Sequence, residues 1–540
     1  MLFVSFAAVA LVAHLANAAG TDATIESHTL PVLARAQFVS SAPRHRVLKL
    51  VVGLQLQNRA ALDGLLVELY DPSSPNYRRF LTPPQFAERF APPRRQYQQV
   101  MRYLRANGLE VTGSYPNRMA IEARGTVDRV ERAFGVRINS YAIGGRTFVA
   151  NDRDPRVPAE FAGVIGSVAG LEDFLELQAH SRVAPSTAAA SAGGFVPVGF
   201  TPGQIATAYD FASAYQHGYD GAGATLAIAT AYSFKASDVT AFWSTFGGVM
   251  PDYSIVSVGG VSHRANPETT LDLERAGAMA PGAKILVYEG VNGGNGAFEA
   301  VYNRIVAENK ASVVTTSWGL CEQQMPPALV TLDNNIFAEA AAQGQAWFAA
   351  SGDTGAYDCG DYTTTAVDYP ASDPNVTAVG GTTLMLSSGG AINAEMAWGY
   401  SGGGVSGLFA QPAFASGPGV SNAYSNGNRQ VADVAFDADP ATGYPVYFNG
   451  AWNEYGGTSF GAPQWAAIFA LINGARGSAP AVGAAGPNLY ALANGALAAP
   501  YTAFNDILIG MNGYYYAGAG WDYVSGWGSP RVWNLVQDLM

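Results

Sequence analysis

The sequence contains few charged residues, only two cysteines and no long apolar run beyond its first residues. Only 13% of the 540 residues are charged while 49% are hydrophobic, and this balance excludes a mainly disordered chain. The 62 glycines follow no three-residue repeat, which excludes a collagen-like chain. A membrane-spanning helix needs about 20 consecutive apolar residues, and we expect none. The length itself predicts two or three domains.

Lysine and arginine are scarcest in the C-terminal part of the chain. Residues 1–200 hold 21 Lys and Arg against 16 Asp and Glu, a net charge of +5, whereas residues 201–540 hold 9 against 26, a net charge of −17. So few cations cannot form a phosphate-binding face, which excludes nucleic acid as a partner of this part. The asymmetry predicts two parts with different tasks.

The two cysteines are Cys321 and Cys359. Neither has a histidine or a basic residue beside it in the sequence, which argues against a thiolate nucleophile. In an exported chain the pair could form one disulfide, and two reduced buried thiols are the alternative.

Residues 1–18 have the pattern of a secretory signal. An apolar run from Leu2 to Ala16 leads into Ala16-Asn17-Ala18, a cleavage site of the small-x-small type. The alternative is an N-terminal membrane anchor, but about 15 apolar residues are too few to span a bilayer. We therefore expect a secreted, extracellular protein without a membrane attachment once the signal is removed.

Residues 25–180 show the pattern of an α+β domain. Helices are expected over 59–69, after Pro93 and over 127–134, with short strands between them and two helices on one face of a sheet. Residues 181–200 are rich in Ala, Ser, Pro and Gly, and this composition predicts an exposed linker of the kind that proteases cut.

Residues 201–540 follow a different pattern, in which continuous apolar strands alternate with helices. This pattern predicts a largely parallel sheet covered on both faces, with ligands at the carboxyl ends of the strands. The strands are expected at 224–229, 285–288, 313–317, 347–350 and 376–379, and the helices include 297–310 and 328–342.

The most informative local segment is GGTSFGAP, residues 456–463, which leads into an apolar helix. Ser459 at the start of this helix would lie at the positive end of the helix dipole, which favours a nucleophile and the oxyanion that it creates. Gly-Thr-Ser-x-x-x-Pro is typical of subtilisin-type peptidases. The simpler alternative is a helix N-cap after a glycine turn.

A serine nucleophile needs a base, and carboxylates are better candidates here than histidines. His217 and His263 lack the His-Gly-Thr setting of subtilisins. Glu268 and Asp272 are four residues apart in a helical run that Asn266 would cap, so both would project from one face. Two close carboxylates resist joint ionisation and share a proton. The alternative is an exposed acidic first turn of a helix.

A third candidate is Asp353, in the segment ASGDTG that follows an apolar strand. Its side chain could form an Asx turn. If protonated, it could instead donate a hydrogen bond to a tetrahedral oxyanion.

Taken in order along the chain, these segments resemble the sedolisin (serine-carboxyl peptidase) family and its precursors of the prokumamolisin type. Near the N-terminus, DPSSPNY (71–77), LTP (81–83) and FAP (90–92) are similar to the family's activation domain. Further along, ExxxD (268–272), AGAMAPGA (276–283), SWG (317–319), SGD (351–353) and GTS (457–459) follow in the family's order. The resemblance covers nearly the whole chain after the signal.

The resemblance implies a fold, an activity and a role for each candidate residue. The fold would be an α/β, subtilisin-like catalytic domain over 201–540 with a largely parallel sheet, preceded by an α+β, ferredoxin-like pro-domain over 25–180. Ser459 would be the nucleophile, Glu268 its general base and acid, Asp272 the group that orients Glu268, and Asp353 the donor to the oxyanion. The activity would be that of a self-processing, acid-acting endopeptidase with a maturation site in 181–200. A tripeptidyl exopeptidase on the same fold is the alternative.

The resemblance also implies one structural calcium ion near the C-terminus. Asp506 and Asp522 would supply carboxylate oxygens, and Ile507, Gly518 and Gly520 would supply carbonyl oxygens, which are the ligands that this hard cation prefers. The alternative is a glycine-rich turn with two solvated aspartates.

Substrate contacts and partners are likewise implied by the resemblance. Ser317, Trp318 and Gly319 would lie along the substrate backbone, while Asp358 and Asp368 lie where some relatives place acidic residues near the S1 and S2 pockets, which suggests tolerance of basic side chains. A Cys321–Cys359 bond would stiffen this wall of the cleft. The partners would be protein and peptide substrates and the pro-domain as an intramolecular inhibitor, in a monomer.

Overall fold

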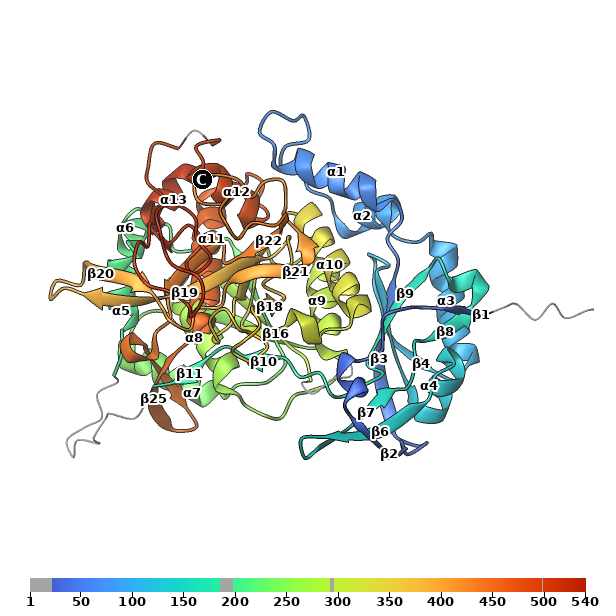
Figure 1. The fold of residues 1–540 in the computed structure, drawn as a ribbon. Helices are drawn as coiled ribbons and strands as arrows, with labels where there is room; N and C mark the ends of the chain where they lie inside the picture. Colours follow the sequence, from blue (N-terminus) through green and yellow to red (C-terminus); the bar gives the residue numbers. More distant parts are fainter. Residues whose placement is uncertain (1–21, 185–197, 292–295, 498) are drawn as a thin grey trace, which may run out of the picture.

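The computed structural model describes residues 22–184, 198–291, 296–497 and 499–540. The expected signal over 1–18 lies outside these residues, as does the part of the expected linker over 185–197. Two domains lie side by side, drawn blue to teal and green to red in Figure 1. No helix of the described residues combines the length and the apolar character needed to cross a bilayer.

The N-terminal domain is built on a four-stranded antiparallel sheet in the order β4-β5-β3-β9. The chain runs from β3 through helices to the pair β4 and β5, then through α4 and on to β9, which is the ferredoxin-like arrangement. Helices α3 and α4 cover one face, because apolar side chains such as Leu104 and Phe134 pack on Leu50 of β3. These elements are β3 (Val47–Leu54), α3 (Arg94–Ala106), β4 (Glu110–Ser114), β5 (Ala120–Thr126), α4 (Val127–Phe134) and β9 (Ile165–Ala169). The predicted α+β domain with two helices on one sheet face is confirmed.

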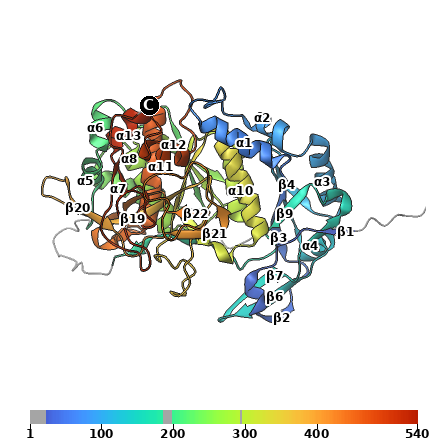
Figure 2. The same cartoon turned by 45° about the horizontal axis from the view of Figure 1, so that its top comes forward.

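Two further helices reach from this domain to its neighbour. Helix α1 (Arg59–Tyr70) was predicted, but α2 (Pro83–Phe90) was not, although Thr82 and Gln85 form a capping box at its start. Both pack on α10 (Pro327–Ala342) of the C-terminal domain through a shared apolar cluster, and Figures 1 and 2 show them above its end.

The C-terminal domain contains an eight-stranded sheet in the order β13-β14-β12-β15-β17-β19-β20, with β23 paired to β19. All pairs are parallel except the one between β19 and β20, so the predicted largely parallel sheet is confirmed. The strands are β12 (Thr225–Thr230), β13 (Asp252–Ser257), β14 (Lys284–Glu289), β15 (Val313–Thr316), β17 (Ala346–Ala350), β19 (Thr377–Leu386), β20 (Ile392–Ala397) and β23 (Val434–Asp437).

Helices cover both faces of this sheet, as expected from its continuous apolar strands. Side chains of α8 (Pro267–Met279) and α11 (Gly461–Ala475) join Leu226 and Phe348 on one face. Side chains of α9 (Ala297–Glu308) and α10 join Ala227 and Trp347 on the other. The remaining helices of this domain are α5 (Pro202–Ala208), α6 (Phe211–Gln216), α7 (Ala236–Phe246), α12 (Ala485–Ala493) and α13 (Val532–Leu539).

The segment after the N-terminal domain crosses the C-terminal domain as two short strands, β10 (Gln178–Ala179) and β11 (Arg182–Val183). β10 pairs antiparallel with β16 (Trp318–Cys321), and β11 pairs antiparallel with β25 (Ala451–Gly456). In Figure 1 this teal segment runs along the lower side of the C-terminal domain. Residues 181–184 therefore lie against the other domain, whereas the composition predicted an exposed linker from residue 181.

Candidate active site

Helix α8 begins as the sequence predicts. Asn266 accepts a hydrogen bond from the Glu268 amide at 2.9 Å, and Pro267 is the first helical residue. Glu268 and Asp272 lie one turn apart and are both fully buried, so an exposed acidic turn is excluded. Burial raises the pKa of Glu268 to about 7, although the hydroxyls of Ser181 and Ser459 act in the opposite direction.

Asp272 is hydrogen-bonded to a hydroxyl group. The Ser317 hydroxyl donates to Asp272 Oδ1 at 2.6 Å. Burial, with the neighbouring Glu268, raises the pKa of Asp272 well above its ordinary value. Because close carboxyl groups titrate together, the pair retains a proton over the acid range, and Asp272 is the better holder of that proton.

Ser459 lies in a 3-10 turn, η5 (Thr458–Phe460), directly before α11, and is fully buried. Its hydroxyl lies 3.4 Å from the Ser317 carbonyl oxygen, to which it donates. Gly457 before it has a φ of +119°, and a Cβ there would lie 2.3 Å from the His180 carbonyl oxygen. A glycine is therefore required where the chain and the crossing segment meet.

Asp353 follows β17 and faces the same turn. Its Oδ1 accepts hydrogen bonds from the amide and the hydroxyl of Thr458, both at 2.9 Å. Burial raises the pKa of Asp353 to about 6, although His180, Thr458 and Arg182 pull it down. The other oxygen, Oδ2, is buried and has no hydrogen-bond partner within the described residues.

His180, which sequence reasoning did not single out, occupies the centre of this site. The Ser459 amide donates to the His180 carbonyl oxygen at 3.0 Å, and the His180 amide donates to the Ser317 carbonyl oxygen at 3.1 Å. The peptide bond from His180 to Ser181 thus lies against Ser459, and the Ser459 amide donates a hydrogen bond to the carbonyl oxygen of this bond. No sequence pattern marks residues 178–184 for this place, because their partners lie far along the chain.

The His180 ring lies in an acidic recess. Its Nε2 is 3.0 Å from Asp368 Oδ2. Burial alone would lower the pKa of His180, but Asp368, with Asp358 and Asp353, raises it to about 10, so the ring is a cation. A Cβ at Gly319 would lie 1.7 Å from Asp368 Oδ1, so a glycine there leaves room for the pair.

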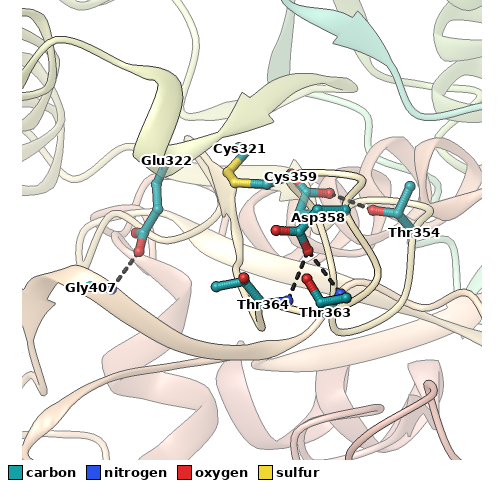
Figure 3. The surroundings of a disulfide bond; sticks show 9 residues. Cys321, Glu322, Thr354, Asp358, Cys359, Thr363, Thr364 and Gly407 are labelled. Atoms are coloured by element: carbon teal, nitrogen blue, oxygen red, sulfur yellow. Dashed lines mark hydrogen bonds between the residues drawn. A yellow bond between two sulfur atoms is a disulfide. The ribbon is translucent and has the colours of Figure 1, made fainter. Parts of the chain in front are cut away.

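The recess is stiffened by a disulfide between Cys321 and Cys359, shown in Figure 3. It closes a loop with a sequence separation of 38 residues, and such a constraint on the unfolded chain stabilises a protein by about 4 kcal/mol. Asp358, beside it, accepts a hydrogen bond from the Thr354 hydroxyl at 3.0 Å. The expected disulfide is confirmed, and the alternative of two reduced thiols is wrong.

The backbone of residues 317–319, expected to lie along a substrate, is paired here with another segment of the same chain. Gln178 pairs with Gly319 and Ala179 with Trp318 in the antiparallel register of β10 and β16. The Trp318 side chain is buried, and its indole N–H donates to Thr230 Oγ1 at 3.1 Å. This contact anchors β16 to β12.

The two histidines after residue 200 lie on the surface, away from these contacts. His217 stacks on Trp533 with ring centroids 4.3 Å apart, and His263 is exposed. Neither forms a hydrogen bond with Ser459 in the part of the chain that the structure describes.

Near the C-terminus, Asp506 and Asp522 approach one short loop. Asp506 Oδ2 accepts from the Gly520 amide and Asp522 Oδ2 from the Gly518 amide, both at 3.0 Å. Ile507 is buried beside them. The two carboxylates that approach this loop offer oxygen atoms, the kind of ligand that a hard cation such as Ca²⁺ prefers.

Comparisons with known proteins agree with this geometry. Residues 34–174 match the pro-kumamolisin activation domain, and residues 201–485 match the subtilase family. Sedolisin of Pseudomonas sp. (strain 101) is 32% identical over 519 residues, which cover 90% of this chain and 86% of sedolisin. Kumamolisin of Bacillus sp. (strain MN-32) is 34% identical over 501 residues, 88% of each chain.

One further relative and one solved structure bear on the activity. Tripeptidyl-peptidase 1 of Canis lupus familiaris is 28% identical over 529 residues, which cover 91% of this chain and 92% of that protein. The solved structure of Pseudomonas sedolisin, a serine-carboxyl proteinase in complex with two molecules of pseudo-iodotyrostatin, has a TM-score of 0.57 and 30% identity, covering 64% of this chain and 98% of that one.

Proposed function

The chain belongs to the sedolisin family of serine-type peptidases, and from this premise we propose that it is a secreted, acid-acting endopeptidase whose precursor cuts itself. The observation that carries the proposal is the position of the His180–Ser181 bond. Its carbonyl oxygen accepts the Ser459 amide, the geometry that an oxyanion hole requires. On this proposal, the chain is a precursor whose own residues 178–184 occupy the cleft in the manner of a substrate.

The proposed chemistry assigns one task to each buried side chain. Ser459 attacks the carbonyl carbon of His180 while Glu268 takes the hydroxyl proton. The oxyanion that forms is held by the Ser459 amide and by protonated Asp353. Glu268 then gives its proton to the amine of Ser181, the C–N bond breaks, and water hydrolyses the acyl-enzyme in the second half of the reaction.

Asp272 keeps Glu268 in a useful protonation state. Glu268 acts as the base in the form of the site in which Asp272 holds the proton and Glu268 is ionised, which is a minority form at acid pH because burial raises the pKa of Glu268 to about 7. The Ser317 hydroxyl fixes the orientation of Asp272 by donating to its Oδ1, although this hydrogen bond by itself lowers the pKa of Asp272.

The acid range of activity follows from Asp353. Its carboxyl donates to the oxyanion only when protonated, and its pKa is raised to about 6 by burial. Activity is therefore present below this value and lost as the pH rises through it.

The path of residues 176–184 supports an endopeptidase over a tripeptidyl exopeptidase. Gln178, the third residue before the bond, is still paired with β16. The chain continues from there into the N-terminal domain, so the cleft is open at the end that an exopeptidase would close. The relation to tripeptidyl-peptidase 1 keeps exopeptidase activity as the second candidate.

A blocked peptide tests the proposed activity. We expect the mature protein to cut an N-acetylated peptide with the sequence of residues 174–184 after its histidine, at about pH 4. An exopeptidase would leave the acetylated peptide intact and release a tripeptide from the same peptide with a free amine. Mass analysis of both digests separates these results, and no hydrolysis of either peptide would contradict peptidase activity altogether.

The acidic recess supports a preference for a cationic residue before the scissile bond. Asp368 and Asp358 flank the His180 ring, and a cavity of about 360 Å³ beside it extends along Gly319 and Leu320. This space is sufficient for a longer lysine or arginine side chain.

The pro-domain would act as an intramolecular inhibitor because its linker fills the cleft. Among the described residues of the crossing segment 178–184, His180 forms an ion pair with Asp368 and Arg182 forms one with Asp353. The globular part contributes hydrogen bonds, such as those of Lys49 Nζ to the Gly259 carbonyl and of Asn117 Nδ2 to Glu339 Oε2. Protonation of Asp353 at acid pH weakens its ion pair with Arg182, and this gives the charge asymmetry of the sequence a role in release.

The oxygen-lined loop near the C-terminus is proposed to hold one structural Ca²⁺. Asp506 and Asp522, with the carbonyls of Ile507, Gly518 and Gly520, would be its ligands. The ion would tie the 504–507 and 517–522 segments together and stabilise the folded domain.

Calcium removal has a measurable consequence for stability. We expect a chelator to lower the melting temperature of the Ser459→Ala precursor by about 5 °C, because a ligand at a hundredfold its dissociation constant contributes about 2.7 kcal/mol. Asp506→Asn should lower it to the same value and remove the effect of the chelator. Asp361→Asn, which changes an exposed loop aspartate with two amide donors, is the control. A wild-type melting temperature independent of calcium would contradict the site.

Export is proposed from the pattern of residues 1–18, and substrates are proposed to be proteins and peptides met outside the cell. The protein is proposed to act as a monomer.

A further inference from the structure

Arg182, two residues after the bond described above, makes three contacts with the C-terminal domain. One guanidinium N–H donates to the Asp353 carbonyl oxygen. Its Nε lies 3.8 Å from Asp353 Oδ2. The guanidinium lies 4.8 Å from the centroid of the Tyr400 ring. A hydrogen bond to a carbonyl, an ion pair and a cation–π contact together form a recognisable cation-binding arrangement.

The partners of Arg182 are held in place independently of it. Tyr400 follows β20, and its carbonyl accepts from the Gly355 amide at 2.9 Å, which ties it to the loop of Asp353. The Trp398 ring supports the Tyr400 ring at a centroid distance of 5.6 Å. Tyr400 is nevertheless 51% exposed, so its ring is fixed at the surface of the cleft.

The backbone of the segment explains why Arg182 reaches this place. Residues 182 and 183 pair with β25, which keeps the chain extended beyond the bond. Side chains two apart in an extended chain point to the same side. His180 and Arg182 therefore both point toward the loop that carries Asp353, while Ser181 points the other way, toward Glu268.

We infer that the cleft has a subsite on the leaving-group side that binds a cationic side chain two residues after the scissile bond, formed by the Tyr400 ring and the Asp353 carbonyl. Arginine suits it better than lysine, because a planar guanidinium both stacks on a ring and donates in a fixed direction. The inference rests on the proposed function, since it takes the His180–Ser181 bond as the one that is cut.

The first test compares two peptides. One carries the sequence of residues 178–184 and the other has alanine in place of its arginine. For the mature wild-type protein we expect kcat/KM to be about tenfold higher with arginine, a factor typical of one cation–π contact with one charge-assisted hydrogen bond. Tyr400→Leu should reduce this ratio to about two. Tyr362→Leu, at another exposed tyrosine, should leave it unchanged.

Two results of the peptide comparison would contradict the proposed subsite. Equal rates for the two peptides with the wild-type protein, or an unchanged ratio in Tyr400→Leu, would overturn the subsite. Hydrolysis of neither peptide would refute the proposed function instead, and the second test decides the subsite in that case.

The second test needs no activity. In the Ser459→Ala precursor, we expect amide hydrogen exchange over residues 178–184 to be about tenfold faster when Arg182→Met or Tyr400→Leu is added. Arg153→Met, which removes an exposed arginine paired with Asp152, should change nothing in this segment. Unchanged exchange in both cleft variants would overturn the subsite.

Discussion

Replacing Ser459 by alanine leaves the precursor at full length in acid and lowers peptide hydrolysis by on the order of 10⁶-fold. The hydroxyl is the only group of this residue that can form the acyl-enzyme, while the amide that holds the oxyanion is kept. The residual rate would come from the oxyanion donors and from substrate binding alone. Gel analysis of acidified precursor and a fluorogenic peptide assay measure the two effects.

The matched control for this variant is Ser372→Ala. Ser372 is equally buried but lies outside the contacts of Ser459, so its loss removes a buried hydroxyl without touching the reaction. It should process at the wild-type rate. A Ser459→Ala precursor that still matures at low concentration would exclude Ser459 as the nucleophile.

Replacing Asp353 by alanine lowers kcat by about 10²- to 10³-fold, the usual loss when an oxyanion donor is removed. Asparagine at this position should restore part of the rate, because its amide donates at every pH. The decisive readout is the pH profile. In the wild-type protein, activity falls as the pH rises through about 6, where the pKa of Asp353 lies.

In Asp353→Asn this decline near pH 6 is absent, because the asparagine amide donates to the oxyanion at every pH. Asp437→Asn is the control, since Asp437 is also fully buried with a raised pKa but accepts its hydrogen bonds from Leu384 and Thr442. An unchanged profile in Asp353→Asn would remove Asp353 from the oxyanion role.

The catalytic carboxylates could be found in the sequence because their signals are local. Asn266 and Pro267 mark the start of a helix, and a spacing of four places Glu268 and Asp272 on one face. Ser459 is marked by the glycines before it and the apolar helix after it. Each of these inferences needed only the residues within one or two helical turns of the catalytic side chain.

His180 and Arg182 could not be found in this way. Residues 178–184 have no periodic pattern, and their strands exist only because β16 and β25 offer edges to pair with. The composition predicted an exposed linker from residue 181 onward, because composition reflects local preference and carries no information about a cleft formed by distant parts of the chain. Helix α2 was missed for a different reason, because its two opening prolines resemble a loop although they also suit a first helical turn.

The most direct test of the central claim is the identity of the first bond cut when the purified wild-type precursor is brought to about pH 4. Mass spectrometry of the earliest products should show one fragment that ends at His180 and one that begins at Ser181, both absent from Ser459→Ala. A first cut at another bond, or the same cut in Ser459→Ala, would contradict the account.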